Sequence, residues 1–306
     1  MTRSAPTAKF AFAAGAALAM ALSAGAAHAG MGEKDVARTV SFGGHCARCE
    51  LSGRKLIGAS FTAAHFEGST LIGADLRGAE LLGSNFSSGD FTRADLRQAE
   101  LVGSVFTEAV FVSSRMDGVE AQGSTFARAN LTAASLAGAS TQMTSFVGAN
   151  LTRTNFSEAE MEGANLTRVL APRANFNAAQ MQMAVLTSGM FDNATFRGAS
   201  LDRALLKNAS FNGADFTGAT LMHADLRGAN LGNARHLTQA QINAACSDSS
   251  TRLPAGLKPK ECAPRILMMR RPVAPPAIPV PPAPPSPPGP PPAPRYIVAS
   301  DSHRVP

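Results

Sequence analysis

Tryptophan is absent from the 306 residues, tyrosine occurs once, and only 16% of the side chains are charged. The six histidines are scattered, and no Ser-His-Asp order, metal-ligand spacing or phosphate-binding glycine loop stands out. These absences argue against an enzyme, and we expect no cofactor and no metal. The basic aromatic groove that nucleic-acid binding needs is also missing. The composition predicts a soluble chain with one repeat domain and tails.

What the chain does contain is a large apolar residue at every fifth position. Of the 37 positions counted by fives from Leu51 to Leu231, 34 are Leu, Phe or Met, and the exceptions are Ala121, Thr141 and Ala171. A second, mostly small residue stands two places before each. Neither an α-helix nor a flat strand keeps a five-residue period on one face. The chain must therefore turn every five residues, which predicts a solenoid with a dry core.

The units AD-L-RG, AN-L-TR and AD-F-TG resemble the A(D/N)LXX unit of the pentapeptide-repeat family. The resemblance covers Leu51–Leu231 without a gap. It implies an all-β fold, a right-handed quadrilateral β-helix with four pentapeptides per coil and the central and small residues pointing inward. Residues 51–235 would then make about nine coils, roughly 45 Å long at the usual strand spacing.

Residues 20 apart should stack on one wall of such a rod. We number the walls 1 to 4 by their first central residues, Leu51, Leu56, Phe61 and Phe66. Two ladders of phenylalanine are predicted, the first on wall 4 and the second taking over on wall 2, so that core volume stays nearly constant. These ladders are Phe66, Phe86, Phe106, Phe126 and Phe146 on wall 4, and Phe156, Phe176, Phe196 and Phe216 on wall 2.

Wall 3 is predicted to pack most loosely, because Ala121 and Thr141 are neighbours in its core. Four glutamates stand just before its centres: Glu80, Glu100, Glu120 and Glu160. Like charges at this spacing repel by ~0.2–1 kcal/mol. We interpret the row as a solvated stripe; the alternative is an interaction stripe for a cation or a basic partner.

Apolar residues at outward positions are candidates for a partner surface or a homodimer contact. They are Val110, Val112, Leu170 and Met190 on wall 1, and Leu82, Val102, Met143 and Met183 on wall 3.

The four cysteines form two local pairs at opposite ends of the repeat, which rules out one shared zinc site. We predict a disulfide for Cys46 and Cys49 and another for Cys246 and Cys262. Redox-active thiols and metal handling remain alternatives for Cys46 and Cys49. Haem attachment is disfavoured because histidine precedes this pair instead of following it.

A cap is predicted for residues 236–264, since the last coil would otherwise expose its core and an unpaired edge. Thr238-Gln-Ala-Gln241 is a capping-box pattern and predicts a short helix through about Cys246. The run HLTQAQINAAC followed by a further cysteine resembles the C-terminal cap of exported pentapeptide-repeat proteins.

Both termini differ from the repeat. Residues 1–29 have the basic start, apolar run and Ala27-His28-Ala29 of a signal peptide cleaved after Ala29, followed by a lead-in over residues 30–50. This predicts a periplasmic or secreted protein with no integral membrane span in its mature form. Residues 265–306 are predicted to be a disordered tail, in which 14 prolines between Pro272 and Pro294 favour a polyproline II spacer.

The leading functional prediction is a non-enzymatic exported scaffold for an unknown protein partner. The first alternative is a nucleic-acid mimic that binds DNA gyrase, as some relatives do. Residues 51–235 carry 15 Lys and Arg against 16 Asp and Glu, a charge of −1, which fits a DNA mimic poorly. The second alternative is thiol redox or metal handling through Cys46 and Cys49.

Overall fold

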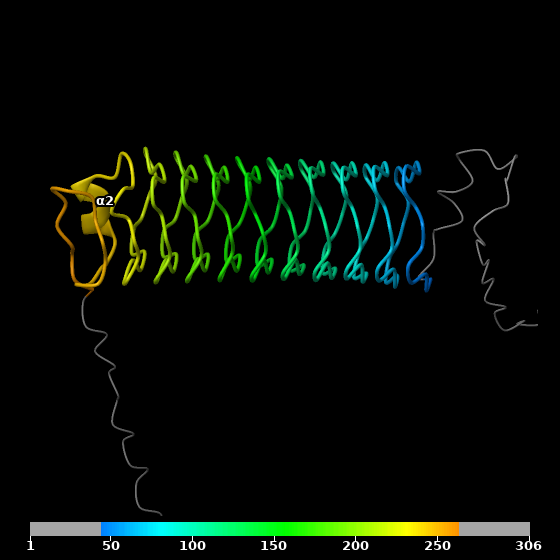
Figure 1. Ribbon diagram of the computed structural model, residues 1–306, viewed down its shortest axis with the longest axis horizontal. Coiled ribbons are helices and arrows are strands. Elements are labelled where there is room, and N and C mark those ends of the chain that lie inside the picture. The colour runs from blue at the N-terminus through cyan, green and yellow to red at the C-terminus, as the bar shows by residue number, and fades with distance from the viewer. Residues whose placement is uncertain (1–43, 263–306) are drawn as a thin grey trace, which may run out of the picture. The chain divides into compact units, whose positions relative to one another are not determined.

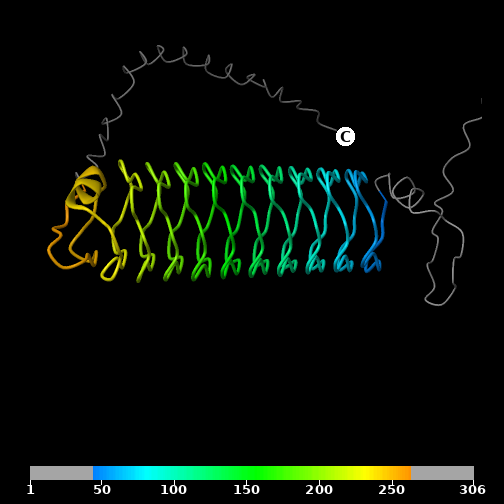
Figure 2. The same cartoon turned by 90° about the horizontal axis from the view of Figure 1, so that it is seen from above.

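The computed structural model describes residues 44–262, and they form a stack of similar coils with one short helix at the C-terminal end (Figure 1). The view turned by 90° shows the same regular stacking (Figure 2). The predicted signal peptide, most of the lead-in and the proline-rich tail lie outside the described residues. No helix among residues 44–262 is long and apolar enough to cross a membrane.

Adjacent coils are joined by parallel bridges between residues 20 apart. On wall 2, nine successive bridges run from Lys55↔Asp75 to Asp215↔Arg235. They join ten stacked residues and span nine full turns of 20 residues, in line with the expectation of about nine coils. The coil begins before the predicted boundary at Leu51, because His45 already pairs with His65.

Each pentapeptide is held by hydrogen bonds to both neighbouring coils and by one of its own. Around Leu71, the N–H groups of Leu71 and Gly73 donate to Asp90 and Thr92 at 2.7 and 2.9 Å, and Ala74 donates back to Leu71 at 3.0 Å. Because the chain turns in every pentapeptide, only one residue in each five forms a β-bridge to the neighbouring coils. The β-structure of residues 44–262 therefore consists of isolated parallel bridges, and the right-handed quadrilateral β-helix stays a prediction in its details.

The core is a continuous column of fully buried side chains, in which aromatic rings stack from coil to coil. On wall 4, Phe106 and Phe126 lie 4.9 Å apart with nearly parallel rings. On wall 2, Phe176 and Phe196 lie 5.0 Å apart. The aromatic column crosses between these opposite walls where Phe146 meets Phe156 edge-on at 5.6 Å. Wall 1 adds two stacked pairs that were not predicted, Phe91 with Phe111 and Phe191 with Phe211.

The C-terminal end is closed by α2, Gln239–Ala244. The predicted capping box is confirmed: the Thr238 hydroxyl accepts from the backbone N–H of Gln241, and the Gln241 side chain accepts from the N–H of Thr238 at 2.8 Å. The helix ends two residues before Cys246, earlier than predicted. The Gln241 amide also donates to the carbonyls of Phe216 and Ala219 at 2.9 and 2.8 Å, so it covers an edge of the last coil.

Candidate interaction surface

The corner that follows wall 3 carries exposed methionines. Met143, Met183 and Met222 have exposed fractions of 74, 47 and 52%, and Val102 adds a fourth exposed apolar side chain. Met143 and Met183 were predicted to face outward; Met222 was not singled out, although it follows the wall-3 centre Leu221 and could have been found by the same count.

The backbone makes these methionines unusual. The third residue of each pentapeptide turn adopts a left-handed conformation, and glycine fills many of these positions. Met143 and Met183 have φ of 54° and 57°, and they are the only large apolar residues with positive φ among residues 44–262. A side chain in this region costs roughly 1–2 kcal/mol relative to the right-handed region. Because these side chains are exposed, burial in the core does not offset this conformational cost.

A groove of about 300 Å³ lies on the same corner, over the C-terminal coils. Charged and polar side chains alternate along it with two of the methionines. Its lining residues are Glu162, Gln182, Met183, Asp202, Arg203, Met222 and His223.

The predicted glutamate stripe is exposed and borders this corner. Bridges pair Glu80 with Glu100 and Glu100 with Glu120, and within residues 44–262 no ion pair involves these three. Glu160 stands two coils further on and accepts a hydrogen bond from Ser140 at 3.3 Å. Wall 3 thus presents uncompensated negative charge toward its N-terminal end and methionines toward its C-terminal end.

Two buried polar atoms at the corner after this wall lack a hydrogen-bond partner. The amide oxygens of Gln122 and Gln142 are the only buried side-chain oxygen or nitrogen atoms without a hydrogen-bond partner in the described part of the chain. They follow Ala121 and Thr141, the two small centres of wall 3. Looser packing of this wall stays a prediction, and these atoms lie where it was expected.

The other predicted apolar set, on wall 1, is less continuous. Leu170 and Met190 are exposed and form a bridge with each other, whereas Val110 and Val112 are half-buried. Leu205, on the adjoining wall 4, adds an exposed apolar residue that was not predicted.

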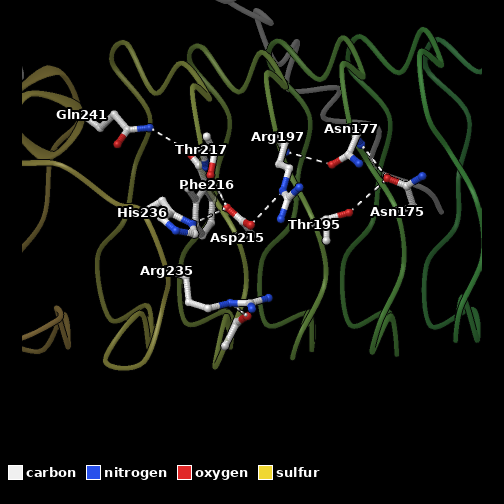
Figure 3. Close-up of polar contacts among 11 residues, drawn as sticks. Asn175, Asn177, Thr195, Arg197, Asp215, Phe216, Thr217, Arg235, His236 and Gln241 are labelled. Atoms are coloured by element: carbon white, nitrogen blue, oxygen red, sulfur yellow. Dashed lines mark hydrogen bonds and ion pairs between the residues drawn. The ribbon is translucent and has the colours of Figure 1, made fainter.

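A polar cluster on wall 2 connects the last coils to the cap (Figure 3). Its centre is Asp215, which is fully buried. Arg197 donates to its carboxylate at 2.8 Å, the Thr217 hydroxyl at 2.6 Å, and the His236 ring lies at 3.0 Å. Burial alone would raise the pKa of Asp215, but these hydrogen bonds outweigh it and hold the pKa well below its usual range. The cluster therefore keeps a negative charge inside the fold.

All four cysteines are joined in the two predicted pairs, Cys46 with Cys49 and Cys246 with Cys262, at Cα separations of 5.6 and 4.5 Å. The second pair lies close to Asp225. These three residues are the only group of three potential metal ligands found within residues 44–262. The two sulfur atoms are bonded to each other, and the Asp225 carboxylate is taken by Arg227 and Lys207 at 2.6 and 3.3 Å. The disulfide links two parts of the cap, and its sulfur atoms and the Asp225 carboxylate are already engaged, so this group is poorly suited to bind a metal.

The geometry defines a solenoid that presents four walls built from five-residue units. The family model described as pentapeptide repeats matches it in eight copies, over residues 46–83, 55–95, 90–128, 129–168 and 199–235. The chain belongs to the pentapeptide-repeat family.

Solved structures of pentapeptide-repeat proteins resemble this chain. HetL from the cyanobacterium Nostoc sp. strain PCC 7120, a pentapeptide repeat protein involved in heterocyst differentiation regulation, is 31% identical with a TM-score of 0.54, covering 61% of this chain and 83% of HetL. QnrB1, a plasmid-mediated fluoroquinolone resistance protein, is 19% identical with a TM-score of 0.34, covering 68% and 92%. The comparison with curated proteins finds no match.

Proposed function

We propose that this chain is a non-enzymatic scaffold, exported to the periplasm or secreted, that binds a protein partner through the corner after wall 3. Its fold would be the right-handed quadrilateral β-helix of its family. Export is supported by the signal-like residues 1–29 and by the two disulfides, which persist in oxidising compartments.

One observation carries the choice of surface: Met143 and Met183 occupy strained left-handed positions while exposed to water. Methionine is flexible and polarisable, and it is overused at surfaces that adapt to a partner. The adjacent unpaired glutamates add a field that attracts basic side chains. The partner we infer therefore combines apolar and basic residues. The involvement of HetL in the regulation of heterocyst differentiation is compatible with a contact of this kind.

A photo-crosslinking amino acid placed at Met183 tests the proposal in cells that export the full chain. The matched control is Ala133, which is also exposed and left-handed but lies at the corner after the opposite wall. We expect a discrete crosslinked partner from position 183 and little or none from position 133. Equal crosslinking at both positions, or none at either, would contradict this choice of surface.

Fractionation of the same cells tests export. The expected product begins at Gly30 and is found outside the cytoplasm. Unprocessed protein in the cytosol would instead favour the nucleic-acid-mimic alternative.

A further inference from the structure

The first coil of wall 4 brings two histidines together. His45 and His65 form a parallel bridge, so their side chains leave the same wall one coil apart. Their ring centroids lie 4.5 Å apart at an interplanar angle of 32°, and both residues are exposed. The 20-residue spacing that builds the core also builds this pair, although along the sequence His65 is only one of six scattered histidines.

A carboxylate fixes the orientation of one ring. Glu67 Oε1 lies 3.2 Å from His65 Nδ1 and also accepts from the Asn85 amide at 2.8 Å. A carboxylate has no N–H or O–H to donate at neutral pH, so Glu67 acts as the acceptor in both hydrogen bonds. Its partner nitrogen, Nδ1 of His65, must then carry the proton. This leaves the Nε2 lone pair of His65 free and directed away from Glu67.

We propose that His45 and His65 form a surface binding site for a divalent transition-metal ion. The ligands are Nε2 of His65 and one ring nitrogen of His45, with water at the remaining positions. Glu67 is a positioning residue, because a carboxylate that accepts from the second nitrogen of a ligating histidine fixes its tautomer and raises its basicity. The nearby cysteines, Cys46 and Cys49, take no part because they are bonded to each other.

Copper(II) is the best probe, since it binds nitrogen ligands most tightly in the first-row divalent series. The full chain, made without a histidine tag, is titrated with CuCl₂ by calorimetry and examined by electron paramagnetic resonance. We expect one copper ion per chain with hyperfine structure from two nitrogens. His45→Gln and His65→Gln should each weaken binding at least 10-fold and remove the two-nitrogen signature.

Two further variants separate the roles. Glu67→Gln should weaken binding by about 10-fold while the two-nitrogen signature remains, as loss of an orienting partner does. His223→Gln, an exposed histidine elsewhere on the rod, should bind copper as the unchanged protein does. Thermal unfolding confirms that each variant is folded. Binding that survives both His45→Gln and His65→Gln, or no copper binding by the unchanged protein, would overturn the proposal.

Discussion

The phenylalanines of the core are the largest residues in the column, and they stack on one another from coil to coil. Phe156 is fully buried, stacks on Phe176 at 5.4 Å and meets Phe146 where the aromatic column changes walls. Its neighbours are tied to both adjacent coils by backbone hydrogen bonds, so they are poorly placed to collapse into a vacancy.

Phe156→Ala should therefore lower the free energy of unfolding by ~3–5 kcal/mol, the cost of removing a buried phenylalanine and leaving a cavity. Urea unfolding followed by circular dichroism measures it. Phe156→Leu is the matched control and should cost clearly less, since leucine already fills equivalent layers such as Leu136. An equal loss in both variants would show that ring stacking, not volume, sets the stability here.

Asp215 makes stability depend on acidity. Its pKa is depressed in the folded state, so its ionised form stabilises the fold at pH values above the unfolded pKa of about 3.9. That contribution is lost as the pH falls through the folded value. Asp215→Asn should be less stable than the unchanged protein at pH 7, and the difference should shrink between pH 5 and pH 2.

Melting temperatures across this range test the prediction. Glu158→Gln is the control and should follow the unchanged protein, since Glu158 is an exposed carboxylate whose neighbours 20 residues away, Gly138 and Ala178, carry no charge. A constant difference between Asp215→Asn and the unchanged protein at every pH would mean that the buried charge does not control the acid response.

At the scale of elements, α2 is too short to be stable alone, since isolated helices of six residues do not persist in water. It is held by its capping box, by Gln241 and by the buried side chain of Ile242. The helix acts as a cover for the last coil, and Gln241 is the residue that joins the two.

Gln241→Ala should cost about 1–3 kcal/mol, because it removes the capping acceptor and leaves two coil carbonyls without their partner. Chemical unfolding measures the loss. Gln241→Glu retains the capping acceptor but places a carboxylate against the same carbonyls, so it should be at least as damaging. Full stability of Gln241→Glu would show that the contact with the coil contributes nothing.

Sequence was sufficient for the features that the repeat imposes. The five-residue period predicts a chain that turns around a dry core, and the family resemblance adds four pentapeptides per coil and hence about nine coils. T-x-x-Q predicts α2, because a capping box fits the first turn of a helix. The sequence was insufficient for the outward positions, where the repeat accepts many residue types. Met222, His45 and His65 stand at outward positions, and their neighbours become visible only when coils are stacked. The isolated character of the bridges also depends on turn geometry that residue identity does not encode.

For the regular coils, residues 45–235, surface and core obey one spacing. Residues 20 apart share a wall, whether they are core phenylalanines, the glutamates of wall 3 or the histidine pair of wall 4. Interaction sites on such a molecule are therefore rows parallel to the axis, not pockets formed where distant segments meet. The proposed partner surface and the proposed metal site can therefore occupy separate faces without sharing residues.

The fixed coil length has a consequence for how such a protein changes during evolution. Loss or gain of 20 residues removes or adds a layer and leaves every other side chain on its own face. Loss of five residues keeps the interior continuous but rotates the segment after the deletion by a quarter turn relative to the segment before it. A row of acidic residues on one wall would then be continued by the residues of a neighbouring wall. A small deletion inside this chain would thus rearrange its exterior while its interior stayed intact.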